Sequence, residues 1–226
     1  MMQNPFAESS VADVYDAWYQ TPMGRAVDQM EQSALLRLAR PMPGELALDV
    51  GCGTGHFSAM LAEEGAIVTG CDTSRAMLTH ARRNHPDLRW HYADARDLPY
   101  ADASWDLVLS VTMLEFIREP TRALDEMWRV VRPGGRLVVA VLQAGTPWHA
   151  SYVREAAEGP SPFAAAHFYQ RDELVDRLGR YGSPRVTTCV HMPPDSRPPR
   201  CLSLVEFWGR LTRPGQAAML IGRVEK

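Results

Sequence analysis

From Leu46 onward, short apolar runs alternate with segments in which apolar residues recur every three or four positions. The first pattern is typical of buried strands and the second of helices that bury one face. We predict strands over residues 46–50, 66–71, 88–92, 105–110, 136–142, 185–190 and 217–224. Between them we predict helices over about 54–64, from Ser74, from Pro120 and over 171–178. This alternation predicts a doubly wound α/β fold, in which helices cover both faces of a parallel sheet.

Local signals support these element ends. Thr73 or Ser74 can cap the second helix, and Pro120 suits the first position of a helix because its missing N–H would be unpaired there anyway. The run Arg132–Gly135 should end that helix and turn the chain into the fifth strand.

Three stretches fall outside this frame. Residues 1–40 are amphipathic and predicted to form a helical lid, residues 143–169 are rich in alanine and aromatic residues, and residues 191–216 are rich in proline. We predict a single domain, with residues 1–40 as an N-terminal helical lid segment and residues 41–226 as the main domain. Residues 143–169 and 191–216 would be lid insertions, since long connections without structure of their own are usually lids or disordered segments.

The strongest chemical signal is the sequence Asp49-Val-Gly51-Cys-Gly53-Thr-Gly55, directly after the first strand. Glycines at a strand-to-helix turn let the backbone approach a ligand closely, and the helix N-terminus offers free N–H groups. A dinucleotide fingerprint starting at Gly51 would need glycine or alanine at His56, and it has neither.

This turn closely resembles the first motif of class I S-adenosylmethionine-dependent methyltransferases. The resemblance continues through Asp72 at the end of the second strand and Ala93-Asp94-Ala95 after the third. The stretches 97–106 and 124–135 are similar to those of the ubiquinone and menaquinone biosynthesis group, so that the likeness covers about residues 45–142. It implies a Rossmann-like, mostly parallel, seven-stranded sheet whose last strand is antiparallel.

The resemblance also implies roles for individual residues. Gly51, Cys52, Gly53 and Gly55 would shape the turn beneath the methionine part of the cofactor, and Asp49 would orient that turn. Asp72, with Thr73 beside it, would hold the ribose hydroxyls; as a ligand-facing carboxylate it should add little to the stability of the unbound protein. The adenine would meet the residues Met77, Asp94 and Ala95, and the cofactor's amino group the backbone carbonyls of Ser110 and Val111. Met77 is equally well explained as a core residue of an amphipathic helix.

The aromatic run Tyr15-Asp-Ala-Trp-Tyr19 and Arg25 resemble the N-terminal lid of such enzymes, where Tyr15, Tyr19 or Arg25 would close over the cofactor. Alternatively, this run only anchors a helix on the core. Four residues near the expected cleft are candidate acids or bases, although each is more often a surface or satisfied side chain: Glu115, His149, His167 and His191. The sequence assigns no catalytic residue.

Composition narrows the class further. The net charge is −3, which argues against a general nucleic-acid binder. No apolar run is long enough to span a bilayer, no signal peptide is evident, and the four cysteines form no metal-like spacing, so we expect a cytoplasmic protein without a metal. Residues 171–226 carry ten basic and six acidic side chains, which reflects arginine-rich coding or an arginine-lined site for an anionic acceptor.

The resemblance therefore implies an S-adenosylmethionine-dependent methyltransferase that acts on a small molecule by in-line displacement and releases S-adenosylhomocysteine. The alternative is a non-catalytic S-adenosylmethionine-binding or regulatory protein of the same fold. A nicotinamide-dependent oxidoreductase with a Tyr-x-x-x-Lys pair is excluded because the only lysine is Lys226.

Overall fold

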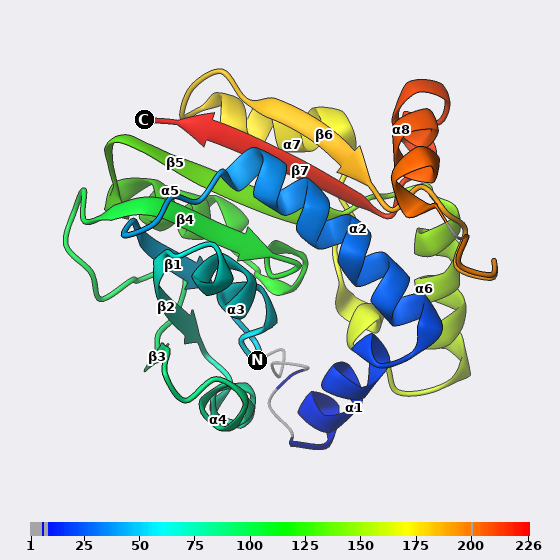
Figure 1. The fold of residues 1–226 in the computed structure, drawn as a ribbon, viewed down its shortest axis with the longest axis horizontal. Helices are drawn as coiled ribbons and strands as arrows, with labels where there is room; N and C mark the ends of the chain where they lie inside the picture. Colours follow the sequence, from blue (N-terminus) through cyan, green and yellow to red (C-terminus); the bar gives the residue numbers. More distant parts are fainter. Residues whose placement is uncertain (1–5, 7–8, 200) are drawn as a thin grey trace.

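The computed structural model describes residues 6, 9–199 and 201–226, and it contains one seven-stranded sheet (Figure 1). Its strands are β1 Leu46–Val50, β2 Ile67–Asp72, β3 Arg89–Tyr92, β4 Trp105–Val111, β5 Val131–Leu142, β6 Arg185–Cys189 and β7 Met219–Glu225. The strand order is β3-β2-β1-β4-β5-β7-β6. β7 runs antiparallel to both of its neighbours, and the pairs on the β3 side of β5 are parallel. The predicted fold class, with its antiparallel last strand, is confirmed.

The helices of the described chain alternate with these strands. They are α1 Ser9–Tyr19, α2 Pro22–Ala39, α3 His56–Glu63, α4 Arg75–Asn84, α5 Pro120–Val130, α6 Pro147–Glu158, α7 Arg171–Gly179 and α8 Leu202–Thr212. Short 3-10 turns occur at η1 Leu114–Phe116, η2 Pro162–Ala165 and η3 Pro214–Gln216. As predicted, Ser74 caps α4, and Pro120 is the first residue of α5.

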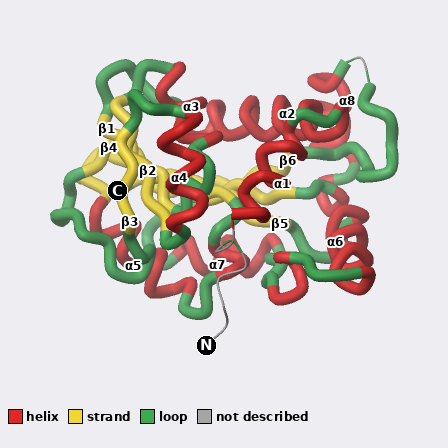
Figure 2. Tube along the Cα trace, turned by 90° about the horizontal axis from the view of Figure 1, so that it is seen from below, coloured by secondary structure: helices red, strands yellow, loops and turns green. Residues whose placement is uncertain are grey.

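Helices cover both faces of the sheet, so that the fold has three layers. Figure 2 shows the sheet between α2 and α3 on one side and α5 and α7 on the other. Because successive strand residues point to opposite faces, Leu107 joins the core beneath α2 and α3, while Val108 joins the core beneath α5 and α7. The pattern of continuous apolar strands follows from this burial on both faces.

Two predicted elements need correction. The run Arg132–Gly135 lies within the bounds of β5, because Val131 already pairs with Trp105 before the register jumps to Arg136 opposite Leu107. Residues 191–216 do contain structure of their own, since α8 lies inside this proline-rich stretch.

The predicted lid stretches are helical where the structure describes them. Residues 1–5 and 7–8 of the predicted N-terminal lid lie outside the described residues. α1 reaches from α2 to α4, where Asn84 Nδ2 donates to Asp16 Oδ2 at 3.0 Å. α6 and η2 form the corresponding part of residues 143–169 and pack against each other.

Candidate functional site

A cavity of about 940 Å³ lies where β1, β2 and β4 end, and it continues beneath α1 and α6. Ligands of open parallel sheets bind at this edge, and pockets for small ligands commonly measure about 300–1,000 Å³. Twelve of the residues predicted for the cofactor line this cavity: Tyr15, Tyr19, Asp49, Gly51, Cys52, Gly53, Asp72, Thr73, Met77, Asp94, Ala95 and Val111.

Three predicted residues do not line it. Arg25 is exposed on α2 and donates to the carbonyl oxygen of Gln20. Gly55 lies behind the turn, where a Cβ atom would come within 2.5 Å of the Trp90 ring. Ser110 is buried below the turn and donates its hydroxyl to the carbonyl oxygen of Val50 at 2.9 Å. Arg25 thus contacts the loop between α1 and α2, Gly55 leaves room for the Trp90 ring, and Ser110 links β4 to β1.

The glycine turn has a backbone that only glycine adopts easily. Gly51 has a φ of +77°, and a Cβ there would lie 2.3 Å from Met113 Cγ. Gly53 has a φ of +54°, and a Cβ there would meet nothing within 4 Å. Gly51 is therefore required by packing, whereas the space in front of Gly53 is open to a ligand.

Asp49 holds the turn to α3. Its Oδ2 accepts the Ser58 hydroxyl at 2.6 Å, and the residue is buried at the floor of the cavity. Burial raises the pKa of Asp49 to about 7, an effect that the Ser58 bond partly offsets. Such a carboxyl group can become the counter-ion of a ligand's ammonium group.

Asp72 braces the turn from the next strand. Its two oxygens accept the backbone N–H groups of Gly53 at 3.0 Å and Ser74 at 2.7 Å. Burial raises the pKa of Asp72, and these N–H bonds lower it in part. These bonds argue against the expectation that Asp72 contributes little to the unbound protein, because its carboxylate joins the glycine turn to the start of α4. A backbone hydrogen bond from Thr73 also lowers the pKa of Asp72. An ionised carboxylate has about four acceptor sites, so acceptor capacity remains for ligand hydroxyls.

The adenine side of the predicted site contains Met77 and Asp94. Met77 is buried on α4 and still lines the cavity, so it has both a core contact and a ligand-facing surface. Asp94 binds the Arg96 guanidinium through Nε and Nη2, at 2.7–3.2 Å, and hydrogen bonds from Arg96 lower the pKa of Asp94. Part of the acceptor capacity of Asp94 is thus already used.

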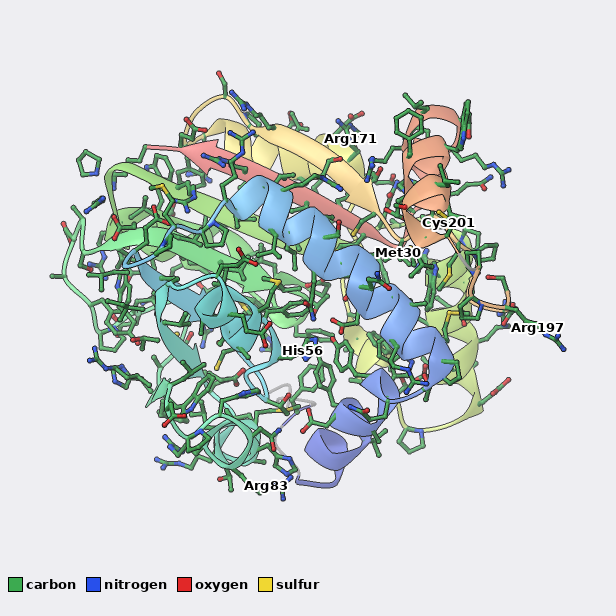
Figure 3. The ribbon with its side chains drawn as sticks, viewed as in Figure 1. Met30, His56, Arg83, Arg171, Arg197 and Cys201 are labelled. Carbon is green, nitrogen blue, oxygen red and sulfur yellow. The ribbon has the colours of Figure 1, made fainter. Side chains whose placement is uncertain are left out.

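α1 contributes two phenols to the wall of the cavity. The hydroxyls of Tyr15 and Tyr19 lie 3.3 Å apart, and burial raises the pKa of Tyr15 to about 12. The Tyr19 ring stacks on His56 with ring centroids 4.2 Å apart, and His56 Nε2 lies 2.6 Å from Asp28 on α2. His56 lies at the start of α3, between that helix and the two N-terminal helices (Figure 3). A stacked ring and a short polar contact therefore join α1 and α2 to the start of α3, beside the glycine turn.

The four candidate acids or bases from the sequence do not line the cavity. Glu115 is buried and accepts the Leu142 N–H at 2.6 Å; burial raises the pKa of Glu115 to about 7. His149 accepts the Gly145 N–H at 3.0 Å, and His167 lies 2.9 Å from Glu173 at the surface. His191 is buried beside Glu206 at 3.2 Å. Each already has a structural partner.

Sequence reasoning predicted no cofactor contact for several other residues that line the cavity. They are aromatic side chains and one acid: Phe6, Trp18, Glu31, Phe116, Trp148, Tyr152 and Phe163. Glu31 could have been noticed because it falls on the apolar face of α2, between Val27 and Leu35 at helical spacing. The rings come from five separate segments, and no local pattern connects them.

An arginine-lined acceptor site is not what the structure shows. Of the described residues in 171–226, only Pro194 and Asp195 line the cavity. Arg171 and Arg197 lie at the outer edge of the molecule (Figure 3). The arginines that do line it, Arg96 and Arg118, belong to the β3–β4 and β4–α5 connections.

The comparisons with known proteins agree with this geometry. Residues 48–139 match the family model described as "Methyltransferase domain". A demethylmenaquinone methyltransferase of Beutenbergia cavernae is 42% identical over 122 residues, which are 54% of this chain and 50% of that protein. A malonyl-[acyl-carrier protein] O-methyltransferase of Serratia marcescens is 35% identical over 140 residues, 62% of this chain and 52% of that protein. The chain thus spans about half the length of these two relatives.

A solved structure shows the same fold over nearly the whole chain. It is a SAM-dependent methyltransferase of Thermotoga maritima, titled a possible histamine N-methyltransferase, with a TM-score of 0.75 and 23% identity. The match covers 95% of this chain and 96% of that one. The predicted resemblance is confirmed. In the described residues no helix is long and apolar enough to cross a membrane, and no cluster of acids, histidines and cysteines could hold a metal ion.

Proposed function

We propose that this chain, whose residues 48–139 match the model of a methyltransferase domain, transfers a methyl group from S-adenosylmethionine to a small-molecule acceptor. One observation carries the proposal. The cavity at the ends of β1, β2 and β4 presents the turn Gly51–Gly53 beside two carboxyl groups, those of the buried Asp49 and the half-buried Asp72.

The residues of this cavity fit the cofactor. The open space in front of Gly53 admits a ligand close to the backbone. Asp72 keeps acceptor sites for hydroxyl groups, and Asp49 is placed to face an ammonium group from the cavity floor. A volume of about 940 Å³ leaves room for an acceptor beside the cofactor.

When bound, S-adenosylmethionine supplies an electrophilic methyl group on a positively charged sulfur. The chain's own part is to bind, to orient and to exclude water. Asp72 and the glycine turn would fix the cofactor, while α1 and α6 would cover the acceptor and hold it in line with the sulfur–methyl bond. Approximation of this kind can contribute about 7–11 kcal/mol to catalysis.

Calorimetry on the purified protein tests the cofactor part of the proposal. We expect S-adenosylmethionine and S-adenosylhomocysteine to bind with micromolar dissociation constants, and NAD not to compete. Tight NAD binding, with no heat of binding for either sulfur compound, would contradict the proposal.

A transfer assay separates the enzyme from a non-catalytic binding protein. The protein is incubated with methyl-labelled S-adenosylmethionine and a small-molecule extract, and the products are separated by chromatography. We expect label in a new small molecule. Binding of the cofactor without any labelled product would favour the regulatory alternative.

We also propose that the protein acts in the cytoplasm. The four unpaired cysteines support this, because disulfides are rare in that reducing compartment.

A further inference from the structure

Glu31 is a buried acid without a partner. It lies on the inner face of α2, is 8% exposed and lines the cavity. Among the described residues, no hydrogen bond or ion pair reaches its carboxyl group. A buried polar group that lacks a partner costs about 1–3 kcal/mol, and more when it is charged. Because the carboxyl group of Glu31 faces the cavity, a ligand bound there could supply the missing partner.

The groups around Glu31 are acids and phenols from five elements. Electrostatic interactions connect it to Asp28 on its own helix, Glu206 on α8, Cys189 on β6, Tyr15 and Tyr19 on α1, and Tyr152 on α6. The nearby basic groups lie beside other acids, and Arg37 on α2 interacts with Cys189 and Glu206. His56 lies 2.6 Å from Asp28, and Arg210 lies 3.8 Å from Glu206. This end of the cavity therefore disfavours an anionic ligand.

The protonation of Glu31 suits proton transfer near neutral pH. Burial raises the pKa of Glu31 to about 8, and the charges of Asp28 and Glu206 add to the effect. A general base works best when its pKa lies near the working pH.

Aromatic rings line the same cavity as Glu31, and a chain of ring contacts begins at Tyr152, which interacts with Glu31. The Tyr152 and Phe163 centroids are 4.2 Å apart, and Phe163 lies 6.3 Å from Phe116. Phe116 in turn packs edge-on against Phe6 at 4.9 Å. Such a wall suits a flat apolar molecule, with Glu31 as a polar group that fixes its orientation.

We propose that Glu31 binds the hydroxyl group of a neutral, flat, apolar acceptor and takes its proton during methyl transfer. The inference rests on the proposed methyltransferase function. The acceptor oxygen forms a bond to the methyl carbon with one lone pair, and the sulfur keeps the electron pair of the broken S–C bond. The hydroxyl proton passes to a Glu31 carboxylate oxygen, which leaves a neutral carboxyl group.

Two probes with the same ring system test this inference. 2-Naphthol carries a weakly acidic hydroxyl group, and 2-naphthoate carries a negative charge. Their binding to the complex with S-adenosylhomocysteine is measured by fluorescence titration from pH 6 upward, below the pH at which 2-naphthol itself ionises. We expect 2-naphthol to bind about tenfold tighter than 2-naphthoate, and its affinity to rise as Glu31 ionises near pH 8, because hydrogen bonds to charged groups are stronger.

Three variants separate Glu31 from the rest of the cavity. Glu31→Leu should lose about tenfold in 2-naphthol affinity, and Glu31→Gln should bind it without the pH dependence. Glu64→Gln, which changes an exposed carboxyl at the end of α3, is the matched control and should behave as wild type.

Calorimetry with S-adenosylhomocysteine distinguishes the two possible failures. If wild type does not bind this nucleoside, the proposed function fails. If wild type binds it but 2-naphthol is not bound, binds equally well to Glu31→Leu, or binds no better than 2-naphthoate, then only the inference about Glu31 is overturned.

Discussion

Asp49 and Asp72 lie on neighbouring strands at the floor of the cavity, but their surroundings differ. Asp49 has a side-chain partner, Ser58, and burial raises its pKa to about 7. Asp72 accepts two backbone N–H groups and so joins β2 to the glycine turn and to α4. The Asp49 carboxyl group can thus change its charge near neutral pH, while the backbone N–H groups fix the position of the Asp72 carboxyl group.

Substitution of Asp72 should affect both the unbound protein and cofactor binding. Asp72→Ala leaves the N–H groups of Gly53 and Ser74 without their acceptor, which should cost about 1–3 kcal/mol and lower Tm by several degrees. Its affinity for S-adenosylhomocysteine should fall at least about tenfold. Asp72→Asn should lose less on both counts, because its amide oxygen can still accept one bond. Thermal unfolding and calorimetry measure the two effects.

Asp87→Ala is the control for this prediction, since Asp87 is exposed in the α4–β3 connection and should leave both measurements unchanged. Normal cofactor affinity in a folded Asp72→Ala protein would remove Asp72 from the cofactor site.

Individual residues were predictable where one local pattern determines their position. The glycine turn and Asp72 follow recognisable strands, so their places at the sheet edge could be predicted. No role could be assigned to Glu31 from the sequence, because the role of an acid on the apolar face of a helix depends on what that face covers in the fold. Met77 remains both a core residue and a predicted adenine contact, since it is buried and lines the cavity.

At the scale of elements, strands were predicted better than the connections between them. β1 matches its predicted bounds because its apolar run begins and ends sharply. α8 was missed because prolines precede it and because its large apolar residues face solvent instead of forming a buried stripe. Phe207, Trp208 and Leu211 are each more than half exposed. A helix that buries so little of its apolar surface gives the wrong signal in a sequence.

α1 and α6 are the elements that we predict to respond to cofactor. α1 packs against α2 and α4, with contacts such as Asn84 to Asp16 and the stacking of Tyr19 on His56, and we expect that it can open without disturbing the sheet. A bound cofactor would fill the space beneath it. Hydrogen exchange measured by mass spectrometry should therefore slow in α1 and α6 when S-adenosylhomocysteine is added.

α5 and α7 serve as the internal control for this experiment, because they cover the sheet on the side of Val108, and the described cavity lining includes no residue of either helix. Equal exchange in α1 and α6 with and without the nucleoside would mean that they are fixed packing elements and not a lid.

At the scale of the whole molecule, the cavity collects buried carboxyl groups. Asp49 and Glu31 line it, and Glu115 belongs to η1, next to Phe116, which lines it. Burial raises the pKa of Asp49 and Glu115 to about 7 and that of Glu31 to about 8. Carboxyl groups of this kind destabilise the folded state when they ionise. The position of Asp49 and Glu31 on the cavity wall indicates that ligand binding accounts for these two, while Glu115 has a structural partner in the Leu142 N–H.

These groups predict how the stability of the unbound protein changes with pH. In the unfolded chain they ionise near pH 4, while the folded protein keeps their protons up to about pH 7–8. Their contribution to the stability of the folded protein is therefore fully present below about pH 4 and is lost as pH rises through 7–8. Hydrogen bonds from arginines lower the pKa of Asp94 and Glu126. These two groups therefore stabilise the folded protein above about pH 4. We expect Tm to be highest near pH 5 and to fall toward pH 8, with a smaller fall in Glu31→Gln. A scan of thermal unfolding from pH 4 to 9 checks this, and a Tm that rises between pH 5 and 8 would show that these carboxyl groups ionise normally in the folded protein.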